Sequence, residues 1–348
     1  MGHGPVMLDL QGTELTAEER ERLRHPATGG VILFARNYAS PDQLYRLVRA
    51  IHEARAPSLI VAADQEGGRV QRFRDGFTQL PPPGRYGQLW DADRQRGLDT
   101  ARLAGWLMAA ELRACGVDLS FAPVLDLDRG LSSVIGDRAF HADPEAVADL
   151  ARAWVQGVHD AGMQAVGKHF PGHGSVAADS HLELPVDERT LTDIELEDLV
   201  PFERLVRHGL GGIMPAHVVY PKADPRPAGF SRFWIRDVLR GRLGFQGVVF
   251  SDDLTMAAAA IEGGFPERAR AALDAGCDMV LVCNHPAGAA EVLDALADYA
   301  DPVAQSRIAH IHGRGGRDWP HLRADPRWRE AVRRLAQPDA TPDLELPL

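Results

Sequence analysis

Cysteine is scarce in this sequence, with three residues among 348. The number is odd, no pair has the Cys-x-x-Cys spacing of a metal or redox motif, and each cysteine lies in or beside an apolar segment. A disulfide framework is therefore not expected. We expect Cys115, Cys277 and Cys283 to pack in the core of a protein kept in a reducing compartment.

Long apolar runs and an excess of positive charge are also missing. No segment approaches the roughly 20 apolar residues that span a bilayer, and the first residues lack the basic and apolar regions of a secretory signal. The formal net charge of -11 opposes a broad phosphate-binding surface. We therefore expect a cytoplasmic protein that binds neither membrane nor nucleic acid.

The sequence does contain eight short apolar runs bounded by turn residues and separated by longer amphipathic stretches. This alternation is typical of parallel strands connected by helices, and several runs lack polar alternation, as strands covered on both faces do. No Gly-x-Gly-x-x-Gly follows an early run, so a (β/α)₈ TIM barrel of the α/β class is favoured over a doubly wound sheet. The expected strands are Val6–Leu10, Gly30–Phe34, Leu59–Ala63, Val117–Ala122, Gln164–Gly167, Gly212–Met214, Gly247–Phe250 and Asp278–Val282.

Several helix starts between these runs have a physical explanation. Ser40 precedes a proline at the first helical position, and so does Asp143. Thr16 with Glu19, and Thr192 with Glu195, have the spacing of a capping box.

No Pro/Gly/Ser-rich linker divides the chain, so residues 1–348 are expected to form one domain. The tail from about residue 300 has weaker periodicity. We expect it to wrap the barrel as a closing segment, with disorder at the extreme C-terminus.

Polar residues gather where the expected strands end, the end of a TIM barrel at which active sites lie. Each has a structural interpretation when taken alone: an Asp after a strand is often a helix cap, His217 fits a core or rim histidine, and His173 fits a loop brace. Asp252 and Asp253 are expected to divide into one inward carboxylate and one cap. The set as a whole predicts a pocket for a neutral, hydroxylated substrate: Asp64, Arg72, Arg138, Lys168, His169, Asp179, His181 and Asp252.

At these residues the chain resembles glycoside hydrolase family 3, and within it the β-N-acetylglucosaminidases (β-hexosaminidases) of bacterial peptidoglycan recycling. The most specific match is Lys168-His-Phe-Pro-Gly-His-Gly followed by Asp179-Ser-His181. Asp64-Gln-Glu-Gly-Gly-Arg-Val and Ser251-Asp-Asp-Leu support it.

The resemblance implies a role for each matching residue. Asp252 would be the nucleophile of a retaining glycosidase, and His181, oriented by Asp179, its acid/base. The substrate would be N-acetylglucosamine linked to 1,6-anhydro-N-acetylmuramic acid, with or without peptide, and no cofactor or metal is implied. A monomer is the default expectation. The sugar would be held by Asp64, Arg72, Arg138, Lys168 and His169.

The roles that the resemblance implies are chemically reasonable, because a retaining mechanism needs a carboxylate and a second group that transfers protons, and a histidine titrates near neutral pH. Gly172 and Gly174, with Ala177 and Ala178, are expected to make the loop before His181 light and permissive, so that it moves over the bound sugar.

Four alternatives stay open at this point. A zinc hydrolase would use His169, His173, Asp179 and His181. The substrate's own acetamido group could replace the enzyme nucleophile. Phosphate could replace water as acceptor, since histidine tolerates it better than a carboxylate does. A sugar-binding barrel without catalysis is the fourth.

Overall fold

The structure is a computed structural model that describes residues 2–177 and 184–335. Eight parallel strands close into a barrel in the order β1-β12-β11-β8-β7-β6-β3-β2, so the first strand pairs with the last. The predicted (β/α)₈ TIM barrel is confirmed. The barrel strands are β1 (Val6–Asp9), β2 (Thr28–Leu33), β3 (Ile60–Ala63), β6 (Leu119–Ser120), β7 (Gln164–Phe170), β8 (Gly212–Pro215), β11 (Val248–Asp253) and β12 (Met279–Val282).

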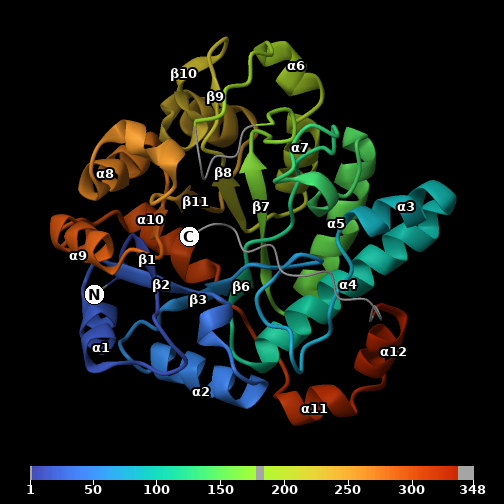
Figure 1. Cartoon of the computed structure of the whole chain (residues 1–348), viewed down its shortest axis with the longest axis horizontal. Helices are drawn as coiled ribbons and strands as arrows, with labels where there is room; N and C mark the ends of the chain where they lie inside the picture. Colours follow the sequence, from blue (N-terminus) through green and yellow to red (C-terminus); the bar gives the residue numbers. More distant parts are fainter. Residues whose placement is uncertain (1, 178–183, 336–348) are drawn as a thin grey trace.

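Helices surround the barrel, as Figure 1 shows. Each strand is followed by at least one of them, and after β8 this is a π-helix, η4 (Phe233–Arg242). The α-helices are α1 (Ala17–Arg24), α2 (Pro41–His52), α3 (Gly84–Ala92), α4 (Arg94–Ala114), α5 (Pro144–Asp160), α6 (Leu191–Leu196), α7 (Leu199–Arg207), α8 (Phe265–Ala275), α9 (Pro286–Ala295), α10 (Pro302–His310), α11 (Trp319–Ala324) and α12 (Pro326–Leu335). Short 3₁₀ turns are η1 (Ala35–Asn37), η2 (Gly136–Arg138), η3 (Ala228–Phe230) and η5 (Ala257–Glu262).

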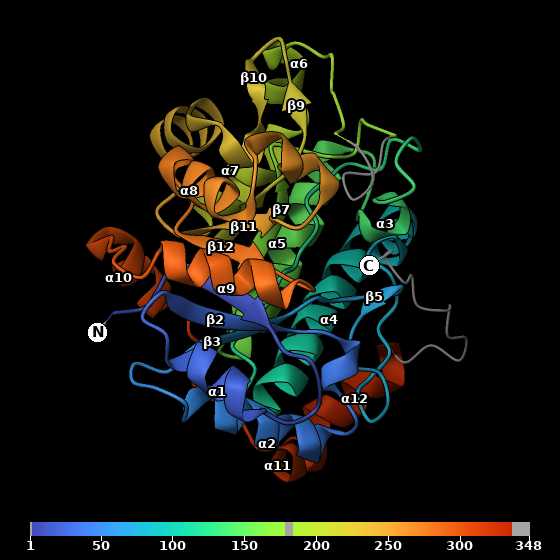
Figure 2. The same ribbon diagram turned by 60° about the vertical axis from the view of Figure 1, so that its left-hand side comes forward.

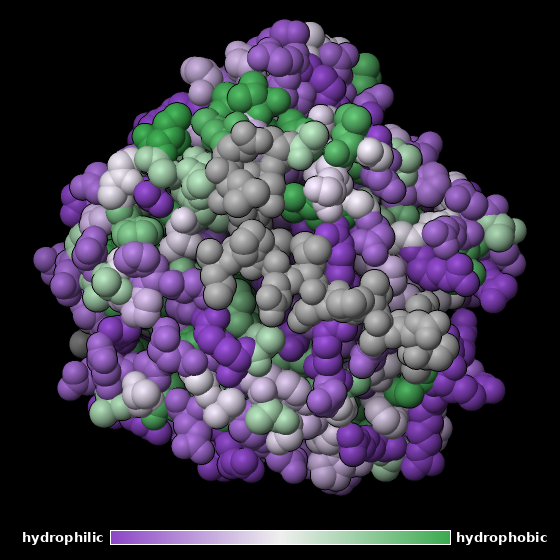
Figure 3. All heavy atoms as spheres, viewed as in Figure 1, coloured by the Kyte–Doolittle hydropathy of each residue, from purple (hydrophilic) through white to green (hydrophobic). Residues whose placement is uncertain are grey.

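Side chains fill the barrel. Strands β11 and β6 are not neighbours in the barrel. Nevertheless, the ring of Phe250 in β11 meets the ring of Phe121, directly after β6, edge to face, with centroids 5.2 Å apart. The three cysteines are free and buried, as expected for core residues. On the face in Figure 3, hydrophobic residues form small groups among hydrophilic ones.

The strand ends differ from the sequence prediction in ways that matter for the site. β6 covers only two residues of the expected Val117–Ala122, whereas β7 continues to Phe170 and β11 to Asp253. Lys168 pairs in register with Met214 of β8. Lys168, His169 and Asp252 therefore lie within strands, not in the loops after them, and the barrel itself fixes their backbone.

A hairpin after β3 was not predicted. It consists of β4 (Gln65–Gly67) and β5 (Val70–Gln71), with Gly67 and Gly68 at φ of 104° and 56° in the turn. Positive φ favours glycine, so the Gly-Gly pair was the available signal. A second hairpin pairs β9 (Val219–Tyr220) with β10 (Asp224–Pro227).

Three of the four predicted helix starts are confirmed. Thr16 and Glu19 form a capping box, and Ser40 and Asp143 cap α2 and α5. The start at Thr192 is wrong: Thr190 caps α6, because the Asp193 carboxylate reaches back 2.9 Å to the Thr190 backbone N–H.

The C-terminal helices α11 and α12 lie beside α4, and both views place them at the opposite end of the molecule from α6 and the β9–β10 hairpin (Figure 2). Trp328 of α12 donates a hydrogen bond of 2.9 Å to Glu111 of α4. The predicted disorder of the extreme C-terminus concerns residues 336–348, which lie outside the described part of the chain. Within residues 2–177 and 184–335, no helix combines the length and the apolar character needed to cross a bilayer.

Candidate active site

A buried lysine connects two acidic side chains at the carboxyl ends of the strands. The Lys168 ammonium lies 2.9 Å from Asp64 Oδ1 and 2.7 Å from Glu66 Oε1. Asp64 directly follows β3, and Glu66 lies two residues further, in β4. Strand β7 thus brings a cation to a carboxylate pair at one end of the barrel, although Lys168 and Asp64 are 104 residues apart in the sequence.

Two arginines complete this charged network. Arg138, in η2, donates from Nε and Nη2 to the two carboxylate oxygens of Glu66, each at 2.8 Å. Arg72 donates to Asp64 Oδ2 at 3.3 Å. Four of the five predicted sugar-binding residues are therefore in one network with Glu66; the fifth, His169, is not part of it.

The network keeps its carboxylates ionised. Burial would raise the pKa of Glu66, but Arg138 and Lys168 outweigh it and hold that pKa well below its usual range. The pKa of Asp64 is likewise lowered against the effect of burial, by Lys168 and Arg72. The pKa of Lys168 is raised by both carboxylates, although burial opposes this. The result is a cluster of fixed charges at the carboxyl ends of the strands, made of groups that can form hydrogen bonds with hydroxyl groups.

His169 is oriented by Asp126, a buried residue that the sequence analysis did not single out. The His169 Nδ1 and Asp126 Oδ2 are 2.7 Å apart, and the backbone N–H of His173 donates to Asp126 Oδ1 at 2.6 Å. Burial would raise the pKa of Asp126, but His169 keeps it lowered. An ionised Asp126 accepts the proton of Nδ1, which fixes the orientation of the ring and of Nε2.

Asp253 takes the capping role expected for one of the two neighbouring carboxylates, and the inward role of Asp252 stays a prediction. Asp253 accepts hydrogen bonds from the backbone N–H of Thr255 at 3.0 Å and of Cys283 at 3.2 Å, so it holds the turn after β11. Burial raises its pKa to about 6. Asp252 accepts a 2.8 Å hydrogen bond from the Asp253 backbone N–H and keeps a half-buried side chain.

The loop after β7 is held close to the barrel as far as it is described. The Tyr220 hydroxyl donates to the Gly172 carbonyl at 2.6 Å, and a Cβ on Gly174 would lie 2.0 Å from the Leu127 carbonyl oxygen. Gly172 adopts a φ of 146°, which favours glycine, and both glycines permit close packing in the described part of the loop. Movement of the later part of the loop stays a prediction.

His173 and His217 fit the structural roles expected for them, a loop brace and a buried core histidine. His173 braces its loop through its backbone contact with Asp126, and burial lowers the pKa of its imidazole. His217 is fully buried, stacks on Phe230 at 5.3 Å and lies 3.2 Å from the Asp253 carbonyl. Asp179 and His181, the predicted acid/base pair, lie outside the described residues.

The sequence analysis missed Glu66 and Asp126. Glu66 had a signal, since it alternates with Asp64 within the motif Asp64-Gln-Glu-Gly-Gly-Arg and could face the same way. Asp126 sits in an apolar stretch and belongs to no motif noticed in the sequence.

A metal centre finds no support in the described part of the chain, where no group of three or more His, Cys, Asp or Glu side chains is arranged to hold an ion. Two of the four ligands considered for zinc, His169 and His173, are in this part. Their ring centroids lie 5.9 Å apart.

Known proteins resemble this chain over nearly its whole length. The family described as the glycosyl hydrolase family 3 N terminal domain matches residues 6–312. A protein named beta-hexosaminidase from Thioalkalivibrio sulfidiphilus is 61% identical over 346 residues, covering 99% of each chain. A beta-hexosaminidase from Alkalilimnicola ehrlichii is 59% identical, again with 99% of each chain covered.

Solved structures agree with the barrel. NagZ from Neisseria gonorrhoeae in complex with N-trifluoroacetyl-D-glucosamine superimposes with a TM-score of 0.92 at 47% identity, covering 97% of this chain and 98% of that one. A second NagZ structure from the same organism, in complex with zinc ion, gives a TM-score of 0.90 at 45% identity, with the same coverage.

Proposed function

Because the chain belongs to glycosyl hydrolase family 3 and is a β-hexosaminidase, we propose that it is a retaining exo-β-N-acetylglucosaminidase of peptidoglycan recycling. It would release terminal N-acetylglucosamine from muropeptide disaccharides ending in 1,6-anhydro-N-acetylmuramic acid, with or without peptide. We place this activity in the cytoplasm, in a monomer whose residues 1–348 form one catalytic domain.

The buried charged network carries the proposal. A sugar has many hydroxyl groups and no charge, so it is recognised by fixed donors and acceptors that need no reorganisation when it binds. Asp64 and Glu66 supply acceptors, and Lys168, Arg72 and Arg138 supply donors, with their positions set by contacts of 2.7–3.3 Å. His169, oriented by Asp126, adds a ring nitrogen that can form a hydrogen bond. The similarity to a NagZ that binds N-trifluoroacetyl-D-glucosamine supports an acylated amino sugar as the ligand.

Asp252 is the proposed nucleophile. It lies near the end of β11, within the strand, so the barrel fixes its backbone. Its carboxylate attacks the anomeric carbon, the leaving oxygen departs with a proton from His181, and a covalent glycosyl-aspartate forms. His181 then removes a proton from water, which attacks the same carbon and restores Asp252. Asp179 would orient the imidazole throughout.

The two neighbouring carboxyl groups differ in the way this mechanism requires. Burial raises the pKa of Asp253 to about 6, and its oxygens accept hydrogen bonds from the turn after β11. Asp252 is therefore better suited to attack the substrate. Asp253 serves to hold the strand end on which the nucleophile sits.

The test is hydrolysis of a p-nitrophenyl β-N-acetylglucosaminide with EDTA present, beside the corresponding β-glucoside, with and without phosphate. We expect turnover of the acetamido sugar alone, insensitive to chelator, with free N-acetylglucosamine as product in both buffers. Equal turnover of the glucoside contradicts the substrate assignment, and a sugar phosphate as product contradicts hydrolysis. Loss of activity with EDTA would replace the mechanism by a metal-dependent one.

A further inference from the structure

A buried carboxylate joins the C-terminal helix to the loop that follows the β4–β5 hairpin. Glu111 of α4 is 2% exposed. It accepts hydrogen bonds from the Thr78 backbone N–H at 2.9 Å and from the Thr78 hydroxyl at 2.7 Å. Trp328 of α12 donates to the same carboxylate from Nε1 at 2.9 Å. Glu111 therefore connects two segments that are far apart in the sequence.

Aromatic packing reinforces the same contact. The ring of Phe77, next to Thr78, meets the ring of Trp319 in α11 with centroids 5.0 Å apart. Trp319 and Trp328 both lie beyond residue 312, where the match to the glycosyl hydrolase family 3 domain ends. Helices α11 and α12 thus support the loop at residues 73–80 from outside the matched residues.

The loop is hydrogen-bonded to the residue that precedes Arg72. The Gln71 side-chain amide donates to the Thr78 carbonyl oxygen and accepts from the Leu80 backbone N–H, both at 3.0 Å. A shift of Thr78 would therefore move Gln71, and with it the backbone of Arg72.

A second glutamine ties the loop to the two carboxylates of the charged network. The Gln65 side chain exchanges two hydrogen bonds of 2.9 and 3.0 Å with the backbone of Phe73. Gln65 lies between Asp64 and Glu66, and Phe73 directly follows Arg72. The backbone on both sides of Arg72 is therefore held by glutamine side chains of the hairpin.

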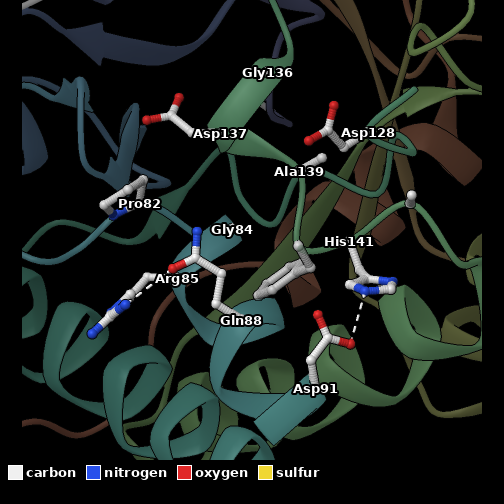
Figure 4. A pocket seen from close by; sticks show the side chains of 12 residues that line it. Pro82, Gly84, Arg85, Gln88, Asp91, Asp128, Gly136, Asp137, Ala139 and His141 are labelled. Atoms are coloured by element: carbon white, nitrogen blue, oxygen red, sulfur yellow. Dashed lines mark hydrogen bonds and ion pairs between the residues drawn. The ribbon is translucent and has the colours of Figure 1, made fainter. Parts of the chain in front are cut away.

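The chain beyond the loop reaches the turn that supplies Arg138. Pro82 and Gly84 line a pocket together with Asp137 and Ala139 (Figure 4). A Cβ on Gly84 would lie 3.3 Å from the carbonyl oxygens of both Asp137 and Ala139, the two neighbours of Arg138. This part of the chain therefore contacts the backbone beside both arginines of the network.

We propose that Glu111 is a positioning residue for the sugar site, acting through the hairpin that carries Arg72, and that Trp328 holds Glu111 in place. The proposal rests on the sugar-binding role given above to the charged network. A binding group must lie within about 0.5 Å of its productive position, so a loosened Thr78 weakens the binding of the sugar through Arg72.

Calorimetry with N-acetylglucosamine tests this in three variants. Glu111→Gln places amide N–H groups where Thr78 donates, and Thr78→Val removes the hydroxyl donor. In both, the dissociation constant should rise by about 3- to 10-fold, as for residues that act through a contact network. Trp328→Phe keeps both bonds from Thr78, so its dissociation constant should rise by a smaller factor.

The same variants should separate KM from kcat. For the p-nitrophenyl N-acetylglucosaminide we expect KM to rise with the dissociation constant, whereas kcat should stay within about twofold of the wild type. The reason is that the proposed nucleophile, Asp252, lies on a different strand, β11.

Two control variants accompany the measurement. Thr78→Ser keeps the hydroxyl donor and should bind the sugar like the wild type. Asp99→Asn removes an exposed carboxylate from the same helix as Glu111 and should also leave binding unchanged. Unchanged binding in both Glu111→Gln and Thr78→Val overturns the proposal. Unchanged binding in Trp328→Phe overturns the part given to α12.

A double variant distinguishes positioning from a role in fold stability alone. If Glu111 acts through Arg72, the loss of affinity in Glu111→Gln/Arg72→Ala is smaller than the product of the two single losses. A loss equal to that product means that the two residues act independently, which overturns the proposal.

Failure of the sugar-site proposal looks different, because the wild type would then bind no N-acetylglucosamine. In that case amide hydrogen exchange decides about the positioning. Faster exchange at residues 65–73 in Glu111→Gln than in the wild type, with α9 unchanged, supports it. Equal exchange at these residues in the two proteins rejects it.

Discussion

Arg138 holds Glu66 through two parallel hydrogen bonds of 2.8 Å, from Nε and Nη2 to the two carboxylate oxygens. Both side chains are buried, and Lys168 approaches the same carboxylate. The Arg138–Glu66 pair is the inner part of the proposed sugar site. Glu66 compensates the positive charge of two of its cations, Arg138 and Lys168.

Glu66→Gln should destabilise the fold by about 3–5 kcal/mol at neutral pH, because it leaves buried cations with too little negative charge. The pKa of Glu66 is lowered in the folded protein, so its stabilising effect is present above about pH 4.3 and is lost as the pH falls through the lower folded value. The wild type should therefore lose stability on acidification below about pH 4 more steeply than the variant. Urea unfolding at several pH values measures this difference.

The exposed Glu21 provides the control, and Glu21→Gln should change the free energy of unfolding by less than about 0.5 kcal/mol. A Glu66→Gln protein as stable as the wild type at pH 7 would mean that the network does not depend on this carboxylate.

Asp126→Asn should impair the proposed sugar binding through His169. An ionised Asp126 fixes the His169 proton on Nδ1, and a hydrogen bond to a charged group contributes about 1.5–3 kcal/mol. We expect kcat/KM for the aryl N-acetylglucosaminide to fall by about 10- to 100-fold, mainly through KM. An exposed substitution such as Asp294→Asn should leave both constants unchanged. A loss confined to thermal stability, with normal KM, would make Asp126 a structural residue only.

Asp253→Asn should change how stability depends on pH between about 4 and 6. Burial raises the pKa of Asp253 to about 6, so the folded protein binds this proton more tightly than the unfolded chain does. The resulting stabilisation is present below about pH 4 and is lost as the pH rises through 6, a change of up to about 3 kcal/mol. The asparagine does not ionise.

The difference in unfolding free energy between this variant and the wild type therefore isolates the Asp253 contribution from the histidines that titrate in the same range. It should shift in favour of the variant as the pH rises from 4 to 6.5. A constant difference would show that Asp253 titrates normally.

His181→Ala should distinguish substrates by their leaving groups. If His181 protonates the departing oxygen, its removal strongly slows the formation of the glycosyl-enzyme from an unactivated disaccharide. A nitrophenyl glycoside has a leaving group that needs little protonation, so it should form the glycosyl-enzyme almost as fast as with the wild type. Rates of the first turnover for both substrates measure this. Equal losses for the two would contradict the role of His181 as acid.

The strands could be predicted from the sequence because buried parallel strands are continuous apolar runs, and all eight are in the barrel. Their ends could not. Lys168 and Asp252 are polar, so pattern alone placed them after the strands, although backbone pairing across the barrel continues through both β7 and β11.

The candidate site was predicted where polar residues follow apolar runs or form motifs. Asp126 lies between Leu125 and Leu127, and only the closed barrel brings its carboxylate to His169.

The covalent intermediate on Asp252 is the central claim, and mass spectrometry tests it most directly. A 5-fluoro N-acetylglucosaminyl fluoride keeps the acetamido group, while its fluorine destabilises the oxocarbenium-like transition state and slows release of the intermediate. The account predicts a peptide containing Asp252 that carries one sugar, and no label in Asp252→Asn. An unlabelled wild type that still turns the compound over, or a sugar on another residue, would contradict it.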